Sequence, residues 1–175
     1  MAEFKSFGKI PRLSAMQMIV TEKIDGTNAC VVVDALGVVS AQSRTRAIQP
    51  GDDNYGFALW VSQNEDQLRE LGHGHHFGEW WGVGIQRAYA LHERRFSLFN
   101  THLWSETRPA CCHVVPILYM GPFDRTVVGQ VTDALATGGS VAAPGYMNPE
   151  GTMVFVTRLD TYIKNPIDNE HKGVQ

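Results

Sequence analysis

Residues 22–28, with the sequence Glu-Lys-Ile-Asp-Gly-Thr-Asn, combine the side chains that covalent catalysis by an amine needs. Lys23 lies two residues before Asp25 and three before Gly26, between two apolar runs. A lysine amine becomes a nucleophile when desolvation or a neighbouring cation favours its neutral form. Gly26 lets a ligand approach the backbone closely, and the side chains of Thr27 and Asn28 can bond to phosphate or ribose. The Lys-x-Asp-Gly pattern also occurs by chance, so a surface turn with a lysine–aspartate ion pair is the alternative.

Five further residues could serve the same chemistry. Glu79 stands inside the aromatic, glycine-bounded stretch 77–82, where a carboxylate is either a ligand contact or a badly placed charge. The other four are Arg44 after an expected strand, Phe99 at the end of an aromatic stretch, Glu150 before a glycine, and Lys164. Phosphoryl-type transfer uses cations at charged oxygens and a carboxylate for a divalent metal, and an aromatic face binds a base. These residue types therefore fit a nucleotide site.

Two clusters have less specific interpretations. Four arginines in one stretch are either a solvated surface or a track for phosphates: Arg87, Arg94, Arg95 and Arg108. Three histidines precede Phe77: His73, His75 and His76. Zinc uses such ligands, but no cysteine lies nearby and no second cluster completes a site, so an exposed loop is the favoured interpretation.

The bulk properties are those of a globular protein. The chain has 175 residues, of which 43% are hydrophobic and 19% charged, with a net charge of −3. This charge argues against nucleic-acid binding by bulk electrostatics but allows a local basic groove. Three cysteines, two of them adjacent, indicate reduced thiols and not a disulfide framework. With no signal-peptide pattern and no membrane-spanning run, we expect a cytoplasmic protein, in the host cytoplasm if a phage encodes it.

Alternating and valine-rich runs indicate the strands that position these residues. They cover residues 29–33, 37–42, 77–81, 95–99, 113–120 and 152–157. A turn at residues 35–37 would join the first two into a hairpin. Two apolar stripes at helical spacing indicate core-facing helices, one over about residues 57–71 and one over about residues 127–135.

The ends of both helices carry recognisable signals. Asp53 or Asn54 could cap the first helix and Gly72 could end it. Asp124 is the expected cap of the second, with residues 138–139, both glycines, as its stop. Grouped strands without regular βαβ alternation predict an α+β fold of antiparallel sheets flanked by helices, with a groove between two sheets. No linker divides the chain, so residues 1–175 are expected to form one domain.

The ordered set of motifs resembles the covalent nucleotidyltransferase superfamily, which contains the ATP-dependent ligases and mRNA capping enzymes. It is most similar to the ATP-dependent RNA ligases, especially the phage type that seals nicks, over residues 22 to about 172. Residues 22–28 match the family's nucleophile motif, and residues 77–82 match the form seen in small ligase-like proteins of phages and bacteria. The resemblance implies a nucleotidyltransferase (ATP-grasp-like adenylation) fold with the nucleotide pocket between the sheets.

The resemblance also implies a role for each matching residue in catalysis. Lys23 would attack the α-phosphorus of ATP and carry AMP. Lys164 would contact the α-phosphate and neutralise charge in the transition state, and Glu150 would help to bind Mg²⁺ or Mn²⁺. The family's last motif usually holds two lysines separated by one residue, whereas here Tyr162 and Pro166 flank Lys164, so one lysine is missing or Lys172 supplies it.

The remaining matches concern nucleotide binding. Glu22 would lie near the adenine, Asp25 would face the ribose or orient Lys23, and Arg44 would contact the ribose or a phosphate. Glu79 would hold a ribose hydroxyl and Phe99 would stack on adenine, with Phe96 as the second choice. The other matching positions of the nucleophile motif are Ile24, Gly26 and Asn28.

The implied reaction has three steps: adenylation of Lys23, transfer of AMP to a 5′-phosphate end, and attack by a 3′-hydroxyl. The expected partner is nucleic acid, at RNA ends or nicks, and not a membrane. The chain ends soon after the last motif, so we expect a minimal form without an accessory C-terminal domain, in which a partner protein could supply grip on the substrate. The alternatives are a DNA ligase or another nucleotidyltransferase with a different acceptor, and a non-catalytic nucleotide-binding module.

Overall fold

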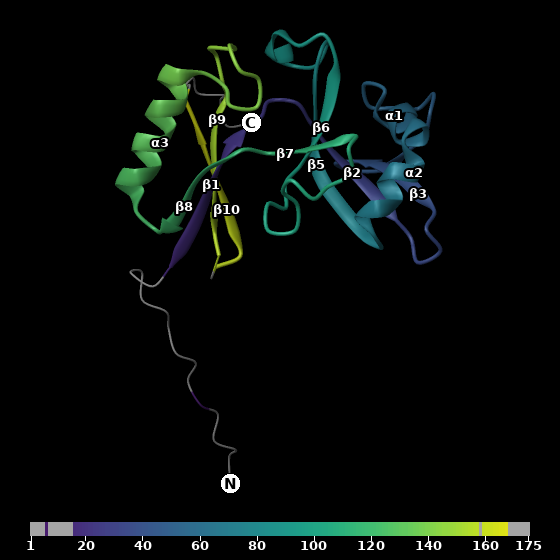
Figure 1. The fold of residues 1–175 in the computed structure, drawn as a ribbon, viewed down its shortest axis with the longest axis horizontal. Helices are drawn as coiled ribbons and strands as arrows, with labels where there is room; N and C mark the ends of the chain where they lie inside the picture. The colour runs from purple at the N-terminus through teal and green to yellow at the C-terminus, as the bar shows by residue number, and fades with distance from the viewer. Residues whose placement is uncertain (1–5, 7–15, 158, 168–175) are drawn as a thin grey trace.

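The fold consists of two β-sheets that face each other, each covered on its outer side by helices. The computed structural model describes residue 6 and residues 16–157 and 159–167. Figure 1 shows α3 on one outer side and α1 and α2 on the other, with the two sheets between them. Most strand pairs are antiparallel, which confirms the predicted α+β class.

The first sheet has four antiparallel strands in the order β10-β9-β1-β8. They are β1 (Gln17–Lys23), β8 (Ile117–Pro122), β9 (Gly151–Val156) and β10 (Thr161–Pro166). Because side chains alternate between the two faces of a strand, Met18 and Val20 of β1 point to α3 and join a buried cluster with Val154. Lys23, at the end of β1, belongs to the opposite face, which is turned to the second sheet.

Helix α3 (Arg125–Gly138) covers the outer face of this sheet. Asp124 caps it by accepting a hydrogen bond from the backbone N–H of Thr126 at 2.7 Å. Gly139, with a φ of 83°, ends it because glycine adopts this left-handed region without a steric penalty. Both end signals that the sequence predicts are confirmed.

The second sheet has six strands in the order β4-β3-β2-β5-β6-β7. They are β2 (Thr27–Val33), β3 (Val39–Ser43), β4 (Ala47–Ile48), β5 (Gly74–Gly82), β6 (Arg94–Leu98) and β7 (Cys112–Val114). Only the pair formed by β6 and β7 is parallel among the described strands. The predicted hairpin is confirmed, since β2 and β3 pair around a turn in which the N–H of Gly37 donates to the oxygen of Asp34.

A helical segment on the outer side of the second sheet supplies its main core. It comprises α1 (Phe57–Gln63), α2 (Glu65–Leu68) and the 3-10 turn η2 (Arg69–Leu71). The single helix that the sequence predicts is therefore interrupted at Asn64, whose side-chain amide donates to the carbonyl of Trp60 and closes the first helix. Gly56, and not Asp53 or Asn54, occupies the N-cap position, but the Asp53 side chain accepts from the N–H groups of Ala58 and Leu59 in the first turn. Gly72 ends the segment, as predicted.

Several strand predictions need correction. The run at residues 113–120 forms two strands in different sheets, because the chain crosses over at Val115 and Pro116. Strands β1, β4 and β10 have no counterpart among the predictions. Within the described residues, no helix is long and apolar enough to cross a membrane.

Candidate active site

A cavity of about 860 Å³ opens between the inner faces of the two sheets. The first sheet contributes Ile19, Thr21 and Lys23 from β1, and Met153, Phe155 and Tyr162 from β9 and β10. The second sheet contributes Asn28, Phe77 and Glu79, and the segment that follows β6 adds residues 99–104. The predicted pocket between the sheets is therefore present, and it lies within the size range of about 300–1,000 Å³ that is usual for ligand sites.

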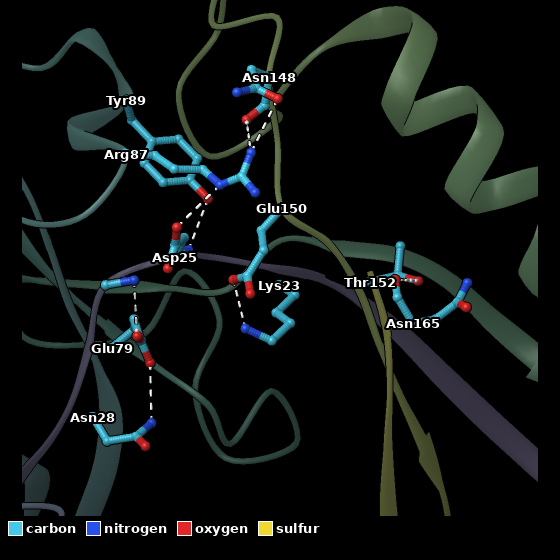
Figure 2. A network of polar contacts seen from close by, with 11 residues as sticks. Lys23, Asp25, Asn28, Glu79, Arg87, Tyr89, Asn148, Glu150, Thr152 and Asn165 are labelled. Atoms are coloured by element: carbon cyan, nitrogen blue, oxygen red, sulfur yellow. Dashed lines mark hydrogen bonds and ion pairs between the residues drawn. The ribbon is translucent and has the colours of Figure 1, made fainter. Parts of the chain in front are cut away.

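Strand pairing brings Lys23 and Glu150 together. Lys23 is the last residue of β1, and its register partner on β9 is Gly151, the residue after Glu150. The Lys23 Nζ lies 2.5 Å from the Glu150 Oε2, and the two side chains are 26% and 20% exposed. Figure 2 shows them pointing toward each other. A half-buried amine thus faces one carboxylate at the wall of the cavity.

Glu79 lies on β5 beside the same lysine segment. Its Oε1 accepts from the backbone N–H of Gly26 at 3.0 Å, and its Oε2 accepts from the Nδ2 of Asn28 at 3.2 Å (Figure 2). Burial raises the pKa of the Glu79 carboxyl to about 7, and the charge of Lys23 opposes this rise. Glu79 is therefore a buried acceptor that can exist in either protonation state near neutral pH.

Gly26 has to be a glycine because β5 lies directly against it. A Cβ at this position would lie 2.5 Å from the Trp80 carbonyl oxygen and 2.7 Å from the Trp81 Cβ. Real side chains do not make contacts this short, and both neighbours belong to the sheet, so they cannot move aside easily. This close approach is what lets the Gly26 N–H reach Glu79.

Asp25 is held by residues that the sequence did not single out as a site. Its Oδ2 lies 3.0 Å from the Nε of Arg87, and its backbone N–H donates to the Tyr89 hydroxyl at 2.8 Å (Figure 2). Arg87 also donates to the backbone and side-chain oxygens of Asn148. The three residues 88–90 all have positive φ, which is strained for side chains other than glycine. A strained turn thus ties the segment after Lys23 to the segment before Glu150.

The Glu22 carboxylate points away from the cavity and into the outer side of the first sheet. Only 1% of Glu22 is exposed, and its side chain accepts three hydrogen bonds from the loop after α3. The donors are the Ser140 hydroxyl at 2.5 Å and the N–H groups of Val141 at 2.8 Å and Ala142 at 2.9 Å. In this structure the side chain anchors a loop, so a contact to adenine would fall to its backbone.

The two aromatic candidates for base stacking differ in burial. Phe99 is partly buried, lines the cavity and packs against the cluster that contains Ile24, Trp81 and Val115. Phe96 is 0% exposed and packs against Phe57 in the main core, so the second choice from the sequence is wrong. Ile24 lines the cavity but is itself buried, which leaves its side chain a packing role.

Lys164 and Arg44 are the candidates that neither line the cavity nor contact a residue of the lysine segment, whereas Asp25, Gly26 and Glu150 lie outside the lining but belong to that segment or contact it. Lys164 is exposed on β10, opposite Met153 and two residues from Tyr162, so it shares the cavity-facing side of the sheet. Arg44 is exposed in the turn between β3 and β4. The structure therefore brings Lys164 to the rim and does not bring Arg44 to the cavity. Lys172, the other candidate lysine, lies outside the described residues.

The structure shows where the arginine cluster and the histidine cluster lie, whose roles the sequence left open. The arginines bond mainly to the protein itself: Arg87 as above, Arg94 to the carbonyls of Val83 and Tyr55, Arg95 to Glu93, and Arg108 to the carbonyls of Cys112 and Ser105. The prediction of an exposed loop holds for His73, which is exposed in the bend before β5, and is wrong for the other two histidines. His75 and His76 belong to β5, and all three line the cavity.

The residues present fit a divalent cation only together with a nucleotide. Among the described residues, no group of three or more histidine, cysteine or carboxylate side chains is arranged to hold a metal ion. Mg²⁺ is commonly bound by one or two carboxylates with phosphate oxygens and water as the other ligands. Glu150 offers such a carboxylate next to Lys23, which is where phosphates would lie.

The two facing, mostly antiparallel sheets with a lysine in the cavity between them match the nucleotidyltransferase fold that the sequence predicts. A family model described as RNA ligase matches residues 16–162, so the chain belongs to the RNA ligase family. A search of curated proteins found no match.

Solved structures of Naegleria gruberi RNA ligase variants are similar to the chain in fold. One variant with AMP and Mn has a TM-score of 0.64 at 18% identity, covering 88% of this chain and 50% of that one. A second, with ATP and Mn, has a TM-score of 0.66 at 19% identity over the same shares. A third, with AMP and Mn, has a TM-score of 0.65 at 18% identity, covering 95% of this chain and 57% of that one. The chain thus spans about half the length of these proteins.

Proposed function

We propose that this chain is an ATP-dependent RNA ligase that works through AMP bound covalently to Lys23. The observation that carries the proposal is the position of the Lys23 amine. It lies at the wall of the cavity between the sheets, 2.5 Å from Glu150 and on the segment that Glu79 holds, in a chain of the RNA ligase family. The Naegleria relatives were solved with ATP or AMP and Mn, which supports the same ligands here.

In the first step, the Lys23 amine loses a proton and forms a bond to the α-phosphorus of ATP. Glu150 is within hydrogen-bond reach of the Lys23 ammonium, so it is placed to take the proton that the amine must release. The free Nζ lone pair attacks the α-phosphorus of ATP, an N–P bond forms, and the bond from that phosphorus to the bridging oxygen breaks. Pyrophosphate leaves and AMP remains on Lys23.

The next two steps move AMP onto the substrate and off again. An oxygen of the 5′-phosphate attacks the α-phosphorus, the N–P bond breaks, and Lys23 takes a proton back. The 3′-hydroxyl of the other end then attacks the activated 5′-phosphorus and releases its proton to the solvent. A phosphodiester forms, and AMP leaves with the electron pair of the broken P–O bond. ATP is consumed as AMP and pyrophosphate for each bond that is made.

The remaining residues position the nucleotide. Glu79 presents buried oxygens that can accept from ribose hydroxyls, and Phe99 presents a ring to the adenine. Lys164 reaches from the rim toward the α-phosphate, where a positive charge stabilises the transition state. A divalent cation, Mg²⁺ or Mn²⁺, would be held by Glu150 and would neutralise phosphate charge when bound. Arg44 keeps its proposed contact to ribose or phosphate only if its turn moves toward the cavity.

The proposed substrate is RNA with a 5′-phosphate and a 3′-hydroxyl, at free ends or at a nick. Bulk charge supplies little attraction for it, because the chain carries a net charge of −3. A partner protein could therefore strengthen the binding of the RNA substrate. The ATP requirement and the three unpaired cysteines are compatible with the expected cytoplasmic location.

The direct test is an end-joining assay with matched acceptors. Protein preloaded with radiolabelled AMP is mixed with 5′-phosphorylated RNA, with the same DNA sequence, and with RNA that lacks the 5′-phosphate. We expect label to move to the phosphorylated RNA, followed by a joined product that is absent with Lys23→Ala. Transfer to DNA alone would support a DNA ligase instead. ATP binding with no covalent label would support a non-catalytic binding module.

A further inference from the structure

The cavity extends well beyond the lysine that would carry AMP. The strand β1 lines it with Ile19 and Thr21 as well as Lys23. An antiparallel strand rises about 3.4 Å per residue, so Ile19 lies roughly 13 Å from Lys23 along the strand. We call the part of the cavity near Ile19 the distal end. A nucleotide held by Lys23, Glu79 and Phe99 occupies the other end.

An aromatic pair from the first sheet forms one wall of the distal end. Phe155 of β9 is the register partner of both Ile19 on β1 and Tyr162 on β10. The rings of Phe155 and Tyr162 have centroids 4.6 Å apart at an interplanar angle of 33°. Both residues line the cavity, yet Tyr162 is 57% exposed. The aromatic ring of Tyr162 is therefore accessible to a ligand in the cavity.

A second aromatic pair comes from the facing sheet. His75 and Phe77 alternate along β5 on the same face as Glu79, and their ring planes are within 19° of each other at a centroid separation of 6.1 Å. His75 lies four residues before Glu79, which bonds to Gly26 at the lysine end, so His75 is also roughly 13 Å from that end. Phe77 is 58% exposed although it lines the cavity.

The distal end has aromatic faces but little positive charge. Among the described residues that line the cavity, Lys23 is the only lysine or arginine. A site that gripped phosphates there would need such cations, whereas flat rings bind the faces of bases and do so with any sequence. Exposed aromatic rings gathered in a cavity generally mark a binding surface.

We infer that the Phe155–Tyr162 and His75–Phe77 pairs form a base-stacking subsite for a nucleotide of the single-stranded RNA end that is to be joined. This inference rests on the proposed function and adds to it the element that recognises the acceptor. The subsite holds a base of the RNA while Phe99 holds the adenine of AMP. It compensates for the weak bulk attraction between a chain of negative net charge and RNA.

The test measures RNA binding separately from adenylation. A short, fluorescently labelled, 5′-phosphorylated single-stranded RNA is titrated with the full chain in the absence of ATP, and its anisotropy is followed. Loss of one stacking ring typically weakens binding about 5- to 140-fold. We expect a loss in this range for Tyr162→Leu and for Phe77→Leu, which keep an apolar side chain but remove the flat ring. Tyr162→Phe keeps the ring and should bind as the wild type does.

A control and the salt dependence sharpen the result. Leu59→Ala changes an apolar residue of α1, on the outer side of the second sheet, that is 48% exposed and lies outside the cavity lining, and it should leave the RNA affinity unchanged. The RNA affinity should fall only slightly as salt is raised, because stacking is not ionic and Lys23 is the only lysine or arginine among the described residues that line the cavity.

Two results would overturn the inference. One is RNA affinity that is unchanged in Tyr162→Leu and Phe77→Leu, or absent in the wild type. The other is an equal loss of RNA binding and of AMP loading in these variants, which would assign the rings to ATP. Failure of the proposed function is distinguishable, since it appears as wild-type protein that never takes up AMP from ATP.

Discussion

Replacing Glu22 with alanine should destabilise the protein by roughly 2–6 kcal/mol, because it removes the acceptor that holds the loop after α3. The substitution leaves the Ser140 hydroxyl and the N–H groups of Val141 and Ala142 without their acceptor. A buried donor without a partner costs about 1–3 kcal/mol. Val141 is exposed, so its N–H can turn to water and adds little to the total. The loss is a large share of the roughly 5–15 kcal/mol that stabilises a typical domain.

Glu22→Gln is the matched control because it keeps the volume and one acceptor oxygen. We expect it to cost about 1–2 kcal/mol, since neutral hydrogen bonds replace charge-assisted ones. Urea unfolding followed by tryptophan fluorescence measures both variants. Because the carboxylate points away from the cavity, the KM for ATP in AMP loading by Glu22→Gln should stay within about twofold of the wild type. Equal stability of the alanine and glutamine variants, or a large rise in this KM, would refute the anchoring role.

Three other predictions follow from single contacts. Gly26→Ala should sharply lower both the melting temperature and AMP loading, because its Cβ would lie 2.5 Å from the Trp80 oxygen; a stable, active variant would contradict this. The Glu79 pKa is raised from 4.5 to about 7, so ionisation opposes folding and stability should fall by about 3 kcal/mol as pH rises from about 4.5 to 7. Glu79→Gln should abolish that fall in urea unfolding at pH 5 and 7.5, and an unchanged pH profile would count against it. Asp53→Ala removes the acceptor for the Ala58 and Leu59 N–H groups and should cost about 1 kcal/mol in the same assay, whereas no change would exclude the cap.

The local features were predictable because short-range physics sets them. The cap at Asp124, the stop at Gly139 and the β2–β3 hairpin each depend on neighbours in the sequence, and all three are confirmed. Strand β1 was missed although it carries Lys23, since its run of Met-Ile-Val-Thr has no alternation of apolar and polar residues and so does not distinguish strand from helix. Strand β10 was missed because it is an exposed edge, held by pairing with β9 alone.

The site was predictable only in part because long-range pairing assembles it. Lys23 and Glu150 are 127 residues apart, and the motif order indicated them through resemblance to a family and not through periodicity. Arg87 and Tyr89 act through a turn of positive φ at residues 88–90 that contains no glycine to signal it. The Glu22 carboxylate points outward because successive side chains of β1 lie on opposite faces of the sheet. This strand was not predicted from the sequence, so Glu22 could not be assigned to a face.

The most direct measurement is the intact mass of the protein after incubation with ATP and magnesium, compared among wild type, Lys23→Ala and Lys23→Arg. The arginine variant keeps a cation beside Glu150 but has no amine that can act as a nucleophile. Covalent catalysis by Lys23 predicts a gain of one AMP in the wild type and in neither variant. An AMP adduct on either variant, or no adduct on folded wild-type protein, would contradict it.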